Sequence, residues 1–185
     1  MSDQHIIIRQ IKAWLSSVVI AHKLCPFAKR EFDTGSIHYA VIKTAELETQ
    51  LELVVAHCSA LGAALDRDTE RETTLLIFPN SLSEFEAYLD FVDLATAVLK
   101  TQGYEGIYQL ASFHPKYRFD GAAEDDPSNY TNRSPYPMIH ILREVSVEAA
   151  LKTYPNPENI PTRNIRVTQN LGLQAVKALL DACYR

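Results

Sequence analysis

The feature that most constrains this chain is a long polar segment, residues 112–137, between two short apolar runs that predict β-strands. This 112–137 segment is rich in proline, asparagine and charged residues, and it has no hydrophobic period of its own. A connection of this length is uncommon inside a compact domain, where it is usually a functional loop or a disordered insert. We therefore predict that the 112–137 segment builds a functional site.

Hydrophobic periodicity predicts a chain in which strands alternate with helices. Strands are expected at residues 38–43, 73–78, 107–113 and 138–143, and helices at residues 4–24, 26–32, 45–65, 81–102, 146–154 and 162–183. Long helices join the first three strands, so these strands should run parallel, with right-handed crossovers. The prediction is one domain, residues 1–185, of the α/β or α+β class, with a small mixed, mostly parallel sheet of about four strands.

The predicted site lies at one edge of this sheet, because ligands bind beyond the carboxyl ends of parallel strands. His114 is the one group of the segment that exchanges protons near neutral pH. Arg118 and Arg133 can hold a carboxylate or phosphate through paired hydrogen bonds. We expect His114 and Asp125 to be catalytic. The expected ligand-binding residues are Arg118, Asp126, Tyr130, Asn132, Arg133 and Ser134.

Cys25 is the third expected catalytic residue. It precedes Pro26 at the predicted start of a short helix, a position that lowers the pKa of a thiol. With His114 as a base, Cys25 can serve as a nucleophile. The alternative is that Cys25 is a buried small apolar residue. A metal site on Cys25 and His114 with nearby carboxylates, which His22 or His140 could join, is also open. Isolated, widely spaced residues are weak evidence for zinc, so no metal ligand is predicted.

Composition narrows the classes of partner. A net charge of -5 and a pI near 5.7 argue against a nucleic-acid-binding protein. No nucleotide-binding motif occurs, and the sequence names no cofactor. No secretory signal or membrane-spanning run is present, and three widely spaced cysteines fit free thiols in a reducing compartment. We expect a cytoplasmic protein without a membrane or nucleic-acid partner.

Four stretches carry a resemblance to a known family. They are LCPFA (residues 24–28), ETTLLIFP (72–79), QLASFHP (109–115) and DDPSNYTNRSPYPMIHILRE (125–144). The chain resembles, over nearly its whole length, a family of uncharacterised proteins, a domain of unknown function found mainly in proteobacteria. The resemblance implies a cytoplasmic bacterial protein of one domain, and it implies no activity.

Three hypotheses for function follow, and the sequence does not decide whether the protein is an enzyme. The first is an enzyme or binder of a small anionic molecule, with His114 and Arg133 within reach of one ligand in a polar pocket. The second is a non-enzymatic protein-interaction module, in which the 112–137 segment is a rigid, tightly packed surface loop. It predicts no sizeable pocket beneath the loop and a flat apolar patch with Tyr117, Phe119, Tyr130 or Tyr136. The third is a metal-binding protein.

Overall fold

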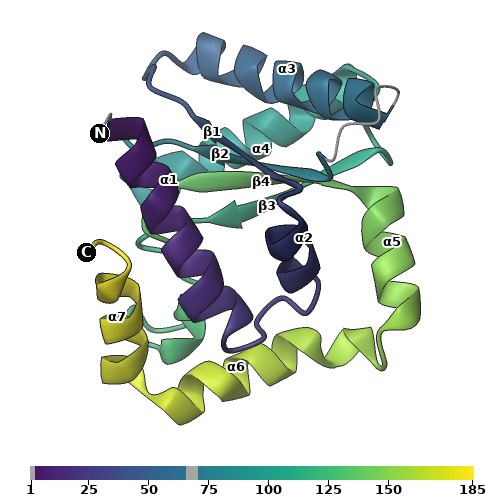
Figure 1. Cartoon of the computed structure of the whole chain (residues 1–185). Helices are drawn as coiled ribbons and strands as arrows, with labels where there is room; N and C mark the ends of the chain where they lie inside the picture. The colour runs from purple at the N-terminus through teal and green to yellow at the C-terminus, as the bar shows by residue number, and fades with distance from the viewer. Residues whose placement is uncertain (1–2, 66–70) are drawn as a thin grey trace.

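The computed structural model describes residues 3–65 and 71–185, which form a four-stranded sheet with helices on both faces (Figure 1). The strands are β1 (Ile37–Val41), β2 (Thr73–Ile77), β3 (Tyr108–Phe113) and β4 (Met138–Arg143). The α-helices are α1 (Asp3–Trp14), α2 (Ala28–Thr34), α3 (Leu47–Leu65), α4 (Phe85–Thr101), α5 (Glu144–Thr153), α6 (Ile160–Leu171) and α7 (Leu173–Ala182). The predicted α/β class and the four predicted strands are confirmed.

The sheet has the strand order β1-β2-β4-β3, and only the β1–β2 pair is parallel. The prediction of a mostly parallel sheet is therefore wrong. β4 follows the 112–137 segment, which leaves from the carboxyl end of β3, so β4 enters from that same edge and runs in the opposite direction. The first three strands still share one direction, and their last residues, Val41, Ile77 and Phe113, lie in register at one edge.

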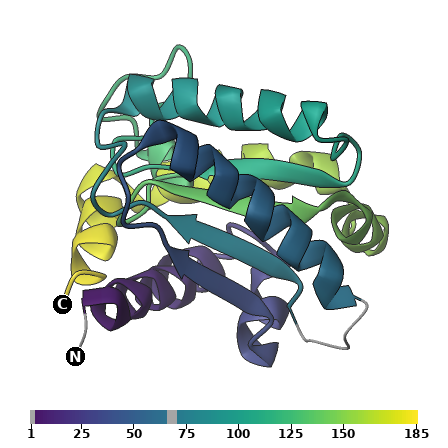
Figure 2. The same cartoon turned by 90° about the horizontal axis from the view of Figure 1, so that it is seen from above.

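Two apolar cores lie on the two faces of the sheet, because successive side chains of a strand point to opposite faces. On one face, Leu76 and Ile139 pack beneath α3 and α4 (Figure 2). On the other face, Leu75 and Met138 pack against α1, whose Trp14 is 2% exposed. Among the helices in the described ranges, none combines the length and the apolarity that a membrane crossing requires.

Two of the predicted helices are interrupted. The helix expected at residues 4–24 ends as a π-helical turn, Leu15–Ile20, and the hydroxyls of Ser16 and Ser17 donate to the Ala13 carbonyl at its start. Such side-chain bonds compete with the backbone ladder and distort helices. The helix expected at residues 162–183 is two helices, α6 and α7, because Gly172 between them has φ 79°, a conformation that favours glycine.

Tyr88 of α4 ties the carboxyl edge of the sheet to the helix above it. Its hydroxyl, fully buried, donates to the Met138 carbonyl at 2.6 Å and accepts from the Phe113 amide at 2.9 Å. Phe113 ends β3 and Met138 begins β4, so one hydroxyl joins the two ends between which the 112–137 segment runs.

Replacing Tyr88 by Phe should therefore lower the free energy of unfolding. Both backbone groups lose this partner in a buried place, which costs about 1–3 kcal/mol. Urea denaturation measures the change. Tyr104→Phe is the matched control, because its hydroxyl bonds Ser59 at the surface, and it should cost less than about 0.5 kcal/mol. Equal stability of the two variants would contradict the prediction.

Candidate functional site

The 112–137 segment folds as a compact loop around a short 3-10 helix, Pro127–Thr131. Asp126 caps that helix: its Oδ1 accepts from the Ser128 amide at 2.8 Å, and this bond lowers the pKa of the Asp126 carboxyl. Asn129, fully buried, accepts from the Phe119 amide at 3.0 Å and donates to the Ala123 carbonyl at 2.8 Å. These side chains satisfy backbone groups that a buried loop would otherwise leave unpaired.

His114 is fully buried at the start of the loop, and both of its ring nitrogens have partners. Nε2 lies 2.9 Å from the Leu82 carbonyl, to which it donates, and Nδ1 accepts from the Lys116 amide at 3.0 Å. This pattern requires the neutral tautomer with its proton on Nε2. The ring packs against Phe85 and Tyr88, with centroids 5.3 and 4.9 Å away, and this burial lowers the pKa of His114. The ring has no unbonded nitrogen for proton exchange with a ligand.

Arg133 uses its guanidinium inside the loop. Nε donates to the Tyr117 carbonyl at 3.1 Å, and Nη2 donates to the Glu124 carbonyl at 2.8 Å. The guanidinium carbon lies 4.6 Å from the centre of the Tyr130 ring, which is 7% exposed. Arg133 thus joins distant parts of the loop through planar, paired bonding and stacking, the geometry to which arginine is suited.

The other predicted ligand-binding residues divide into buried and exposed ones. Asn132 donates to the Ser112 carbonyl at 3.1 Å, and the buried Ser134 donates to the Tyr136 carbonyl at 2.6 Å. Arg118 lies at the surface, 3.9 Å from a Glu86 carboxylate oxygen, and Asp125 is exposed. The structure therefore brings most of the predicted residues together, but their polar groups face one another and the backbone.

Cys25 lies on the other face of the sheet from His114. It packs against the core under α1, whereas His114 packs against the aromatic side chains of α4. Burial raises the pKa of the Cys25 thiol, which is opposite to the shift that activates a nucleophile. This geometry favours the interpretation of Cys25 as a small apolar residue. In the part of the chain that the structure describes, no three His, Cys, Asp or Glu side chains are placed to hold a metal ion.

A hollow that borders the 112–137 segment is small. His22 and Arg133 border it, together with Tyr130 and apolar residues of α6 and α7, and its volume is about 10 Å³. That volume is close to the minimum for one water molecule. It offers no room for a metabolite beside Arg133.

A larger hollow lies on the opposite face, between α3 and α4, and we call it the α3–α4 groove. Its volume is about 390 Å³. It is lined by Glu48, Leu51, Glu52, Val55 and Ala56 of α3, Val98 of α4 and Gln102. Figure 2 shows the two helices diverging away from the ends at which they begin.

The sequence did not predict this groove. The apolar period of α3 places Leu47, Leu51 and Val55 on a core-facing stripe, yet Leu47 is 51% exposed and the other two line the groove. The available signal was the width of the apolar stripe, because Val54, Cys58 and Leu61 are the α3 residues that are buried in the core.

Comparison with known proteins places the chain in a family. The model of a family described as "Protein of unknown function (DUF1415)" matches residues 6–178, so the chain belongs to this family. Neither the curated proteins nor the solved structures contain a match. The expected resemblance to a domain of unknown function is confirmed at this level.

His114 should titrate below the pH at which an ordinary histidine does. Its pKa is lowered in the folded protein, so the unfolded chain binds the proton first, and His114 contributes stability that is lost as pH falls below about 6.5. Side-chain ¹H–¹⁵N NMR over a pH titration should show a His114 midpoint below that of an ordinary histidine, and the neutral ring should carry its proton on Nε2. A midpoint at or above the ordinary value would instead support the predicted proton exchange.

Arg133→Met should destabilise the fold. The variant removes two charge-assisted bonds to loop carbonyls, which contribute about 1.5–3 kcal/mol each at most. Chemical denaturation provides the comparison with Arg118→Met, which removes only a long surface ion pair and should change stability by less than about 0.5 kcal/mol. A greater loss in Arg118→Met would overturn this assignment.

Proposed function

We propose that this protein is a non-enzymatic interaction module whose α3–α4 groove binds a cationic amphipathic helix of a partner protein. The observation that carries the proposal is the groove itself: about 390 Å³ of open space with apolar walls and two glutamates. The polar groups of the 112–137 segment, in contrast, are largely bonded inside the fold.

The walls of the groove have the spacing that a docked helix needs. Leu51 and Val55 are four residues apart and lie side by side on α3, and Val98 faces them from α4. Leu47, 51% exposed, extends the row by one turn. An apolar helix face that docks between them removes this surface from water. Each Å² of apolar surface that is buried in this way stabilises the complex by about 25 cal/mol.

Charge selects the kind of helix. α3 and α4 carry the acidic residues Glu48, Glu52, Glu86, Asp90 and Asp93. Their one basic residue, Lys100, forms an ion pair with Glu105 at 2.8 Å. Glu48 and Glu52 line the groove, so lysine and arginine side chains of a bound helix would meet opposite charge there. Such complementarity steers association and disfavours acidic partners.

The competing hypothesis, an anion-binding or catalytic site in the 112–137 segment, stays a prediction. It requires His114 or Arg133 to exchange an internal bond for a bond to the ligand. Each exchange leaves a carbonyl or amide of the loop without its partner, at a cost of about 1–3 kcal/mol where the group is buried.

A second candidate is the outer surface of the 112–137 segment. Tyr117 packs against Phe85 and Phe119, with ring centroids 5.2 and 5.0 Å apart, and all three rings are half-buried. Rigid, partly exposed aromatic rings are frequent energetic centres of protein interfaces. This surface supports the same class of function at a different place.

The groove is tested with a synthetic helix of leucine and lysine, about five turns long, labelled for fluorescence anisotropy. The wild-type protein should bind it, and binding should weaken with ionic strength. Glu48→Lys/Glu52→Lys should weaken binding by at least about tenfold, a loss of about 1.4 kcal/mol. Ala56→Trp, which fills the groove from an exposed position, should weaken it as well.

The matched control is Glu148→Lys/Glu158→Lys, which makes the same change in net charge at exposed positions on and just after α5. This variant should bind like the wild type. Absence of binding to the wild type, or an equal loss in both charge variants, would refute the groove as the site. Binding that both charge variants retain but that Tyr117→Ala loses would point to the second candidate surface.

A further inference from the structure

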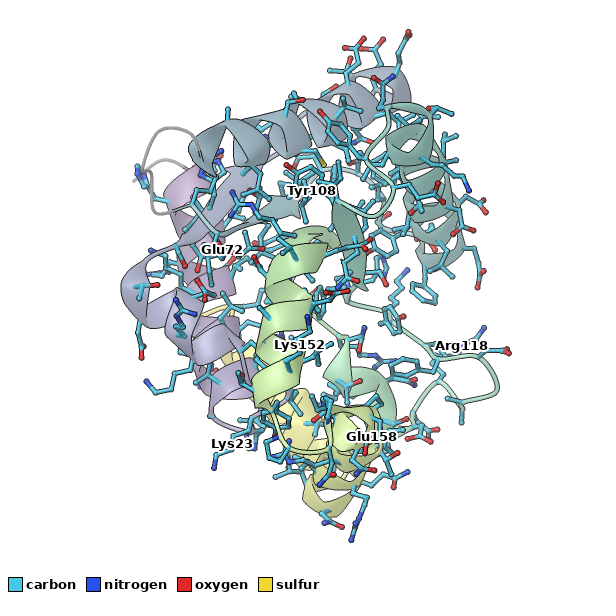
Figure 3. All side chains as sticks on the ribbon, turned by 90° about the vertical axis from the view of Figure 1, so that its right-hand side faces the viewer. Lys23, Glu72, Tyr108, Arg118, Lys152 and Glu158 are labelled. Carbon is cyan, nitrogen blue, oxygen red and sulfur yellow. The ribbon has the colours of Figure 1, made fainter. Side chains whose placement is uncertain are left out.

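A layer of polar side chains lies at the other end of the sheet, beneath α3. His38 of β1 and Thr74 of β2 are neighbours in register, and Thr74 lies opposite Ile141 of β4. Arg143 follows two residues after Ile141 and shares its face of the sheet, diagonal to Thr74. Figure 3 shows this edge, with Glu72 and Tyr108 beneath α3. We call His38, His57, Arg71, Thr74 and Arg143 the polar layer.

Three buried side-chain atoms of the described residues have no hydrogen-bond partner, and all three belong to the polar layer. They are His57 Nδ1, Thr74 Oγ1 and Arg143 Nε. Thr74 is fully buried and Arg143 is 4% exposed. Burial of an unpaired polar atom costs about 1–3 kcal/mol, so each of these atoms favours a partner that the described residues do not supply.

Among the residues that the structure describes, the positive charge of Arg71 in the polar layer has no carboxylate partner. Arg71 Nη2 donates to His38 Nδ1 at 3.0 Å, and Arg71 forms no ion pair with any residue that the structure describes. The His38 and His57 rings have centroids 5.7 Å apart. Burial, Arg71 and His57 together lower the pKa of His38 to about 4.

The nearest carboxylate does not neutralise this charge. Glu72 accepts from Arg143 Nη1 at 2.9 Å, and Arg143 Nη2 donates to the Leu61 carbonyl of α3. Glu72 therefore neutralises the charge of Arg143, and the described neighbours of Arg71 are the two neutral histidines. A cation would be repelled by Arg71, whereas an anion would find a charged donor in it.

We infer that the polar layer binds a small oxyanion of the phosphate class. Arg71 supplies the charge. Thr74 Oγ1, and His57 Nδ1 in the tautomer that carries its proton there, supply donors that the described residues leave unused. The ligand is not the partner of the α3–α4 groove: His38 lies on β1, an edge strand, whereas the groove lies between α3 and α4. The two sites therefore stand independently.

The experiment is a titration of the full-length chain with inorganic phosphate, followed by side-chain ¹H–¹⁵N NMR of the histidines and by calorimetry. Addition of phosphate should shift the side-chain NMR signals of His38 and His57 until the site is saturated. The signals of His114 and His140 should stay unchanged. Acetate should bind more weakly, because a planar carboxylate has fewer acceptor oxygens. A bound anion should also raise the thermal midpoint, since it stabilises only the folded state.

Arg71→Met should reduce phosphate affinity at least about tenfold, and His57→Phe should reduce it as well. Arg166→Met is the matched control, because Arg166 is exposed on α6, and it should bind phosphate like the wild type. Arg71→Met should keep its affinity for the cationic helix, which shows that the variant is folded. Shifts that do not saturate, that affect all histidines alike, or that persist in Arg71→Met would overturn the inference.

Discussion

The insertion of β4 between β2 and β3 is the constraint on which the rest of the structure depends. β4 bonds both neighbours through its backbone, and Met138, Ile139 and Ile141 are fully buried. Because β4 runs opposite to β3, the chain must turn back over the carboxyl edge of the sheet before it can enter. The 112–137 segment makes this turn, and the Tyr88 hydroxyl joins its two ends to α4.

This constraint explains why the segment carries so much polar chemistry. A loop that passes over a sheet edge and packs against helices has backbone amides and carbonyls that water cannot reach, and each needs a partner. His114, Asn129 and Arg133 supply those partners. The residues that chemistry alone would assign to a catalytic site also stabilise the loop, whereas Arg118 and Asp125 project from it into solvent.

In contrast to the 112–137 segment, α3 has apolar or polar side chains without a contact partner on both of its flanks. Toward α4, the divergence of the two helices leaves Leu51 and Val55 against open space. Toward β1, His57 reaches a layer in which three buried polar atoms are unpaired. Unsatisfied surfaces of both kinds, apolar and polar, raise the energy of the free protein, and a ligand that covers them lowers it. Both proposed binding sites therefore lie along α3.

The sequence by itself determined the strands and most helices, because hydrophobic period is a local property of the chain. It also determined that the first three strands share a direction. The position of β4 required the tertiary structure, because strand pairing depends on which edge the chain enters. The bonds of His114 and Arg133 required it too: their identities suggested chemistry, but only packing shows that their polar atoms are occupied. His57, Thr74 and Arg143 are far apart in the chain, so only the folded sheet and α3 could bring them together as one layer.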